Sequence, residues 1–220
     1  MAKKTILIAG LILASILAAF GQSVDDLEDR LKKDPDNKEI LLALGRIYHD
    51  RAGLEGQSGA EEKAEKHLRR LLEIDPDNAS AMVNMGSVLT IQAGNLGESM
   101  EALDLLNRGF ALMDRAVLLA PRNPEIRLVR AVNSLLVPEI FGRNGLVLGD
   151  FEAIQTILAG FGGKMPSDFL LTYHFYYGTA LAGTARNKEA EDHFKKVIEL
   201  APGSSYAAQA KKRLGEKRRP

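Results

Sequence analysis

The side chains best suited to chemistry in this chain are four histidines and several pairs of acidic residues. No two of the histidines His49, His67, His174 and His193 have the three- or four-residue spacing that places two imidazoles on one helix face. His174 lies among aromatic residues with no acidic neighbour in sequence, which favours a packed or groove-lining side chain over a tuned base. The histidines therefore indicate neither a metal site nor a general base.

Other catalytic motifs are missing from the sequence as well. The chain has no cysteine, which excludes disulfides, thiol catalysis and cysteine metal sites. The glycine-rich segment 160–165 looks like a phosphate loop, but no strand precedes it and no Gly-Lys-Ser/Thr follows. Paired acids such as Glu61 and Glu62 fall at expected helix starts, where they favour the helix dipole. We expect no enzymatic activity, no cofactor and no metal ion, with an enzyme that depends on His174 as the alternative.

Prolines at intervals organise most of the chain into units. Pro35, Pro76 and Pro121 stand in turns of the form Asp-Pro-Asp-Asn or Ala-Pro-Arg-Asn. Proline cannot continue a helix, while Asp and Asn cap the helix that follows. Each proline therefore separates the second helix of one unit from the first helix of the next. Small and apolar residues recur at fixed offsets between the prolines, and the last unit shows them without insertion as Tyr177-Gly178, Ala190, Phe194 and Pro202.

This pattern resembles the tetratricopeptide repeat family, whose period is about 34 residues. The resemblance implies an all-α fold, a solenoid of antiparallel helix pairs in which first helices line a concave groove. The alternative is a generic helical bundle with similar turns. We expect one domain over 22–220, with a capping helix over 23–33, repeats over 38–78, 79–123, 124–170 and 171–204, a C-terminal helix over 205–214 and a basic tail over 215–220.

The four units differ in regularity. The first unit has more residues than the family period, and we assign the extra ones to a loop over 53–59. The second unit has still more extra residues, part of which should lengthen its second helix. The third unit is degenerate, because it has arginines where apolar residues are usual and an apolar loop around Pro138. Its second helix is expected over 146–158, and its insertion could roof a cavity near Phe141 and Phe151.

The first 21 residues are unlike the repeats. Lys3 and Lys4 precede an uncharged, largely apolar run over 5–20, and small residues then stand where a signal peptidase cuts, after Gly21. We expect an exported protein, periplasmic or secreted; the alternative is an inner-membrane anchor formed by residues 5–20. Cleavage would remove two lysines and no acid, which leaves a net charge of −2. The basic tail could touch anionic lipid or an acidic partner, or be a solvated end.

The resemblance also implies which side chains face the groove. Asp50 and Thr90 take such positions, but the family's lysine for binding C-terminal carboxylates is replaced by Leu42, Val83 or Phe175. A mixture of arginine, amide and aromatic side chains suits an extended or helical peptide, because aromatic rings supply area and arginine supplies directed donors. The candidate peptide-binding residues are Arg46, His49, Asn84, Ser87, Arg127, Arg130, Asn133, Phe175 and Tyr176.

We therefore expect a non-enzymatic protein–protein interaction scaffold of the bacterial cell envelope, which binds a peptide or protein segment in the groove. No nucleic-acid partner is expected, and membrane contact is expected only through an uncleaved N-terminus or the basic tail. The alternative is a small-molecule-binding or transporter-accessory protein with a cavity near the third repeat.

Overall fold

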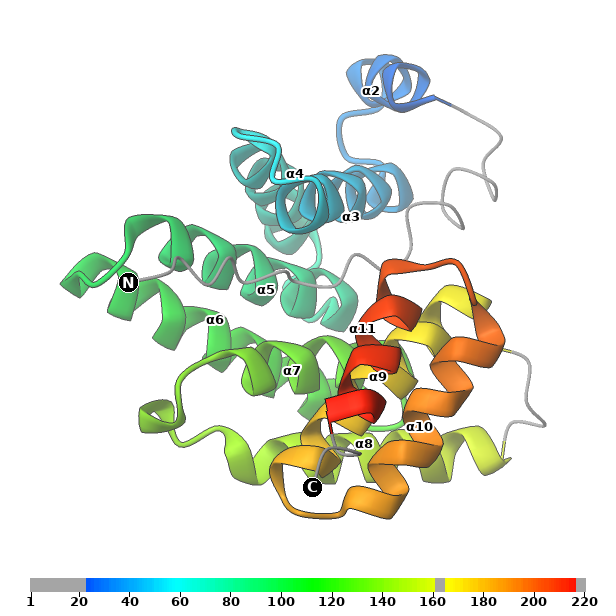
Figure 1. The fold of residues 1–220 in the computed structure, drawn as a ribbon. Coiled ribbons are helices and arrows are strands. Elements are labelled where there is room, and N and C mark those ends of the chain that lie inside the picture. Colours follow the sequence, from blue (N-terminus) through cyan, green and yellow to red (C-terminus); the bar gives the residue numbers. More distant parts are fainter. Residues whose placement is uncertain (1–22, 161–164, 217–220) are drawn as a thin grey trace. The chain divides into compact units, whose positions relative to one another are not determined.

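The computed structural model describes residues 23–160 and 165–216, and every regular element in these ranges is a helix (Figure 1). The all-α class, built from successive helix pairs, is confirmed. The predicted signal segment and most of the basic tail lie outside the described residues. The elements are α2 (Val24–Lys33), α3 (Lys38–Leu54), α4 (Ala60–Ile74), α5 (Ala79–Leu96), α6 (Met100–Leu119), α7 (Pro124–Leu136), η1 (Glu139–Phe141), α8 (Asn144–Gly160), α9 (Ser167–Gly183), α10 (Asn187–Leu200) and α11 (Ser205–Glu216).

The turn residues that the sequence singled out cap the helices. Ser23 forms a capping box with Asp26 at the start of α2. The side-chain oxygens of Asn37 and Asn78 accept hydrogen bonds from the backbone N–H groups of the third residues of α3 and α5. Asn123 does the same ahead of α7. These caps satisfy donors that have no partner within the helix, and so fix where each helix begins.

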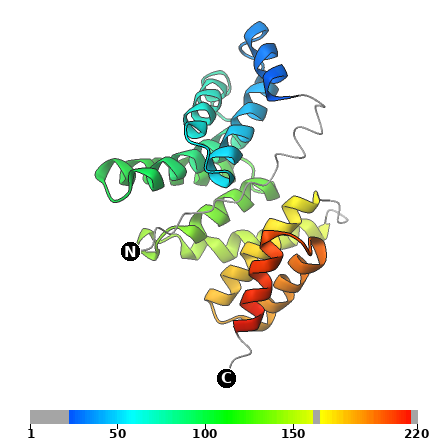
Figure 2. The same cartoon turned by 45° about the horizontal axis from the view of Figure 1, so that its top comes forward.

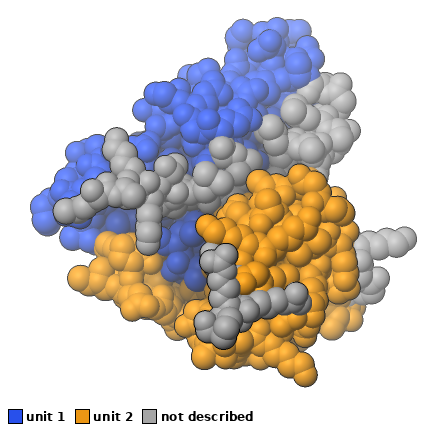
Figure 3. Space-filling model, in the orientation of Figure 1, with its two compact units in different colours: residues 1–136 blue, residues 137–220 orange. Residues whose placement is uncertain are grey.

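The chain divides into two compact units, residues 1–136 and residues 137–220, which are coloured separately in Figure 3. In unit 1, α3 packs against α4 and α5 packs against α6, while α2 lies on α3 and α7 contacts both α5 and α6. In unit 2, α9 packs against α8 and α10, and α11 packs against α9 and α10. The helix pairs within each unit can be followed in the rotated view of Figure 2.

Small residues let the paired helices approach closely. A Cβ added to Gly86 on α5 would lie 2.6 Å from the carbonyl oxygen of Gly109 on α6, and one added to Gly109 would lie 2.7 Å from that of Gly86. The two backbones are therefore in contact at this crossing. In unit 2 a Cβ on Gly178 would instead meet the ring of Phe194 at 3.0 Å, so a side chain fills the corresponding contact.

Some helix ends differ from the sequence-based expectation. Helix α3 continues to Leu54 into the expected loop, which narrows to residues 55–59 and contains Gly56 and Gly59 at positive φ. Helix α9 begins at Ser167, four residues before the expected repeat start, because Pro166 stands directly before it and ends the preceding segment. Helix α8 extends beyond the expected 146–158 at both ends.

The surplus of the second unit lengthens both of its helices, since α5 has 18 residues and α6 has 20. Within residues 23–160 and 165–216, no helix combines the length and the apolar character needed to span a membrane.

Candidate functional site

Five polar side chains on the three first helices of unit 1 form a hydrogen-bonded cluster, which we call the polar cluster. Nδ1 of His49 lies 3.0 Å from Oδ1 of Asp50, and Nε2 of His49 lies 2.8 Å from Oγ of Ser87. Nδ2 of Asn133 donates to Oγ of Ser87 at 3.1 Å, and Oγ1 of Thr90 lies 2.6 Å from Oδ1 of Asn133. All five residues are buried. The cluster therefore joins α3, α5 and α7 through directional contacts.

Within the polar cluster, Asp50, His49 and Ser87 repeat the order of hydrogen bonds found in hydrolytic Ser-His-Asp triads. The hydroxyl of Ser87 is not placed for attack on a substrate, because the residue is 0% exposed and its Oγ accepts a hydrogen bond from Asn133. A buried hydrogen-bond network of this kind specifies how helices pack, and removal of one member is costly because it leaves the other members without partners. We assign the cluster a positioning role for the three first helices.

Arg46 and Asn84 lie on two of the helices that carry the cluster and make different contacts. Nη2 of Arg46 lies 3.1 Å from Oε2 of Glu125, so an ion pair connects α3 to α7. The side chains of this pair are 19% and 38% exposed, respectively, and remain open to a partner. Nδ2 of Asn84 donates to the backbone oxygen of Ser80 one turn earlier on α5. The sequence did not single out Glu125, since nothing in the spacing shows that α3 and α7 come within reach of each other.

Three of the candidate residues, Arg127, Arg130 and Asn133, lie on α7 but do not act as one surface. Nε of Arg127 donates to the backbone oxygen of Pro121, and Nη1 of Arg130 lies 3.1 Å from Oδ1 of Asp114 on α6. Asn133 contacts α5 instead, as part of the polar cluster. The three side chains are therefore held by three different parts of unit 1, although they recur at three-residue steps.

Phe175 and Tyr176 belong to an aromatic cluster in unit 2 and are only 4% and 5% exposed. The ring of Tyr206 on α11 covers both, with centroids 4.7 Å from Phe175 and 6.1 Å from Tyr176. Burial, with a smaller contribution from Tyr206, raises the pKa of the Tyr176 hydroxyl well above its usual range. These two candidate residues thus form core between α9 and α11. The aromatic cluster consists of Phe151, Phe169, Tyr173, Phe175, Tyr176, Tyr177, Phe194 and Tyr206.

Phe151, which the sequence placed beside a potential cavity of the third repeat, is also part of this core. It is 0% exposed, and its ring stacks on that of Tyr177 with centroids 5.1 Å apart. Phe141, the other residue of that expectation, is half-buried and lies in η1.

Two histidines from different helices meet beside the aromatic cluster. Nδ1 of His174 on α9 lies 2.9 Å from Nδ1 of His193 on α10. Burial lowers the pKa of each imidazole to about 4; the neighbouring ring of His193 also lowers that of His174, while Asp192 and Glu189 oppose the lowering at His193. Sequence spacing does not reveal this pair, because the two imidazoles come from different helices and not from one helix face. Among the described residues, no group of three or more His, Asp or Glu could hold a metal ion.

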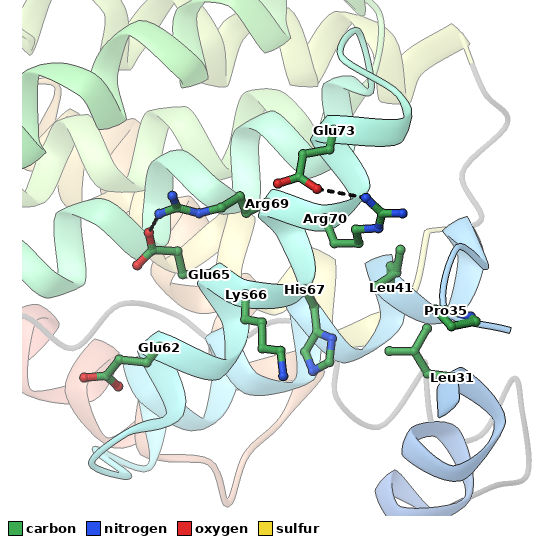
Figure 4. Close-up of a pocket in the computed structure, with 10 residues that line it drawn as sticks. All are labelled: Leu31, Pro35, Leu41, Glu62, Glu65, Lys66, His67, Arg69, Arg70 and Glu73. Atoms are coloured by element: carbon green, nitrogen blue, oxygen red, sulfur yellow. Dashed lines mark hydrogen bonds and ion pairs between the residues drawn. The ribbon is translucent and has the colours of Figure 1, made fainter. Parts of the chain in front are cut away.

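A hollow of about 680 Å³, which the sequence did not predict, lies between α2 and α4. Figure 4 shows the side chains that line it. Four of its charged side chains form ion pairs within the lining, since Arg70 lies 3.0 Å from Glu73 and Arg69 pairs with Glu65. The imidazole of His67 in this hollow stacks on Tyr48, and burial lowers its pKa. The lining residues are Leu31, Pro35, Leu41, Glu62, Glu65, Lys66, His67, Arg69, Arg70 and Glu73.

Comparison with known proteins identifies one repeat and a shared fold. Residues 45–78 match a family model described as tetratricopeptide repeat. A CTR9 homolog of Arabidopsis thaliana is 34% identical over 83 residues, which are 38% of this chain and 7% of that protein, so the match spans a small part of the relative.

Solved structures are similar over more of the chain. The crystal structure of a thermophilic tetratricopeptide repeat protein from Thermus thermophilus has a TM-score of 0.66 at 15% identity and covers 97% of this chain and 99% of its own. That of MamA has a TM-score of 0.47 at 22% identity and covers 81% and 86%. The first of these likenesses shows a shared fold.

Proposed function

Because this chain is a tetratricopeptide repeat protein, a fold that generally serves as a protein–protein interaction scaffold, we propose that unit 1 binds a peptide segment of a partner protein along α3, α5 and α7. The observation that carries the proposal is the ion pair of Arg46 and Glu125, which joins α3 to α7 and stays partly open. A charged donor and a charged acceptor at this position suit recognition of a peptide backbone and its polar side chains.

The polar cluster supports this function by fixing the helices that carry the ion pair. Arg46 precedes His49 by three residues and Asp50 by four, so the three side chains share one face of α3. The hydrogen bond between His49 on this face and Ser87 on α5, together with the bond that Asn133 on α7 donates to Ser87, holds the spacing of the three helices before a partner arrives. A binding surface whose geometry is set in advance loses less entropy on association.

Selection of peptides from a random display library on the full chain tests this function. Binding of the selected peptides to the Arg46→Glu variant should weaken about tenfold, because the partly open guanidinium donor is lost and its ion pair with Glu125 is replaced by two neighbouring acids. Arg115→Glu is the matched control, since Arg115 is an exposed arginine of α6 that pairs with Asp77. Equal binding by the Arg46→Glu variant, with helical content retained, would contradict the assignment.

We further propose that the protein works in the bacterial cell envelope as a non-catalytic adaptor. The support is the sequence of the first 21 residues, in which two lysines precede an apolar run and a small-residue cleavage site. Sequencing the N-terminus of the protein recovered from its native host should give Gln22 as the first residue. Recovery from the cytosol with Met1 retained would contradict export.

A further inference from the structure

Only one of the two carboxylate oxygens of Asp50 has a hydrogen-bond partner. Its Oδ1 contacts Nδ1 of His49, whereas its Oδ2 is buried and has no hydrogen-bond partner. The side chain is 7% exposed. Among the described residues, Oδ2 of Asp50 is the one buried side-chain oxygen or nitrogen that lacks a hydrogen-bond partner.

The other members of the polar cluster can all be satisfied with a neutral imidazole. Nδ1–H of His49 donates to Asp50, Oγ–H of Ser87 donates to Nε2 of His49, Nδ2–H of Asn133 donates to Ser87, and Oγ1–H of Thr90 donates to Asn133. This direction leaves one negative charge at the Asp50 end of the chain of hydrogen bonds. A buried acceptor without a donor is costly, and a charged one more so. A ligand that brings a donor to Oδ2 recovers that cost.

The kind of donor that would suit Asp50 follows from the negative charge of its carboxylate and from the single oxygen that lacks a partner. Arg46, one turn earlier on the same face of α3, already pairs with Glu125, so the charge of this arginine is not left over to neutralise Asp50. A cationic donor is therefore favoured. Guanidinium groups bind carboxylates best through two oxygens, whereas an ammonium needs one acceptor and reaches it on a thin aliphatic stem.

We propose that Oδ2 of Asp50 receives the ammonium group of a lysine from the peptide segment that unit 1 binds. This inference rests on the proposed function and names the chemistry of the partner. The lysine stem would lie along α3, and the ammonium would complete the chain of hydrogen bonds that runs from Thr90 through His49 to Asp50.

The test uses the full chain and peptides selected on it from a random library. The selected peptides should share one lysine position. In synthetic copies, arginine at that position should weaken binding several-fold, and acetyl-lysine should weaken it about thirtyfold or more, because the buried carboxylate loses its charged donor. These peptide changes need no altered protein, so they cannot fail through misfolding.

The Asp50→Asn variant supplies the matched change on the protein side. It keeps the acceptor for His49 and removes the charge, and it should bind lysine and acetyl-lysine peptides with nearly equal affinity. Peptides that bind and respond to Arg46→Glu but show no lysine preference would overturn this inference and leave the proposed function standing. A lysine preference that persists in Asp50→Asn would also overturn it. Failure to select any peptide would contradict the inference and the function together.

Discussion

The two units differ in the side chains that supplement the apolar packing of their first helices. Unit 1 joins α3, α5 and α7 through five buried polar side chains, whereas unit 2 packs α9 against α8, α10 and α11 with aromatic rings. Hydrogen bonds contribute modestly to stability but leave a costly unpaired group when one partner is lost, while buried rings contribute mainly large apolar area. Unit 1 therefore depends on directional contacts for the arrangement of its first helices, whereas unit 2 depends on buried aromatic area.

Tyrosine fluorescence separates the two units experimentally. The chain has no tryptophan, and four of its five tyrosines lie in unit 2, with Tyr48 in unit 1. Circular dichroism follows helix loss in both units. Urea unfolding observed by both signals therefore reports whether a substitution acts on unit 2 or on unit 1.

The largest expected effect comes from the aromatic cluster. Phe151→Ala should lower the free energy of unfolding of unit 2 by about 4 kcal/mol, because a fully buried ring is replaced by a cavity. Phe151→Leu is the control and should cost about 1.5 kcal/mol. A loss below about 1 kcal/mol for the alanine variant would show that the rings are not what stabilises this unit.

The glycines at the helix crossings should differ between the units. Gly86→Ala should cost about 3 kcal/mol in unit 1, because the new Cβ would meet the backbone oxygen of Gly109, which cannot move alone. Gly178→Ala in unit 2 should cost about 1 kcal/mol or less, since the ring of Phe194 can shift. Urea unfolding of the two variants gives both values, and equal costs would contradict the backbone contact.

Removal of a member of the polar cluster should have a smaller effect on stability. Asn133→Ala should cost about 2 kcal/mol, because Ser87 and Thr90 each lose a buried partner. Asn107→Ala on the exposed side of α6 is the control and should stay within about 0.5 kcal/mol of the parent. If Ser87→Ala and Asn133→Ala were additive when combined, the cluster would not act as a network.

The pH dependence of unit 2 should give the smallest effect. His174 and His193 have folded-state pKa values of about 4, below the ordinary 6.5, so between these values the unfolded chain binds protons that the folded chain does not. The free energy of unfolding should therefore fall as pH drops from 6.5 to 4. We expect about 1.5 kcal/mol for the pair, because both rings are partly open to solvent screening.

The control for this pH dependence is a variant with both histidines changed, His174→Gln and His193→Gln. Its unfolding free energy, followed by tyrosine fluorescence, should change less between pH 6.5 and 4 than that of the parent. An identical pH profile for the two proteins would contradict the lowered pKa values.

Helix positions could be predicted from the sequence because their signals are local. Asn37 and Asn78 follow Asp-Pro-Asp and cap the next helix. These caps depend only on a few residues that are neighbours in the sequence. Helix α9 begins at Ser167, four residues before the predicted repeat start at residue 171, because a repeat counted back from Pro202 takes no account of Pro166. The repeat period therefore does not predict a helix start correctly where the preceding unit is irregular.

Contacts between helices could be predicted only in part. The family resemblance placed His49 and Ser87 on first helices, but the hydrogen bond between them and the ion pair of Arg46 with Glu125 depend on how α3, α5 and α7 approach. The burial of Tyr176 depends on α11, whose Tyr206 arrives from outside the repeat. These contacts depend on how helices pack in three dimensions, and the sequence pattern of the repeat does not specify that packing.

The central claim is that a partner peptide binds the first helices of unit 1. The most direct measurement is a titration of the isotope-labelled full chain with a selected peptide, followed by amide chemical shifts. The account predicts saturable shifts along α3, α5 and α7, including residues near Arg46 and Asp50, and little change in α9 and α11. Shifts confined to α9, α10 and α11 would contradict it.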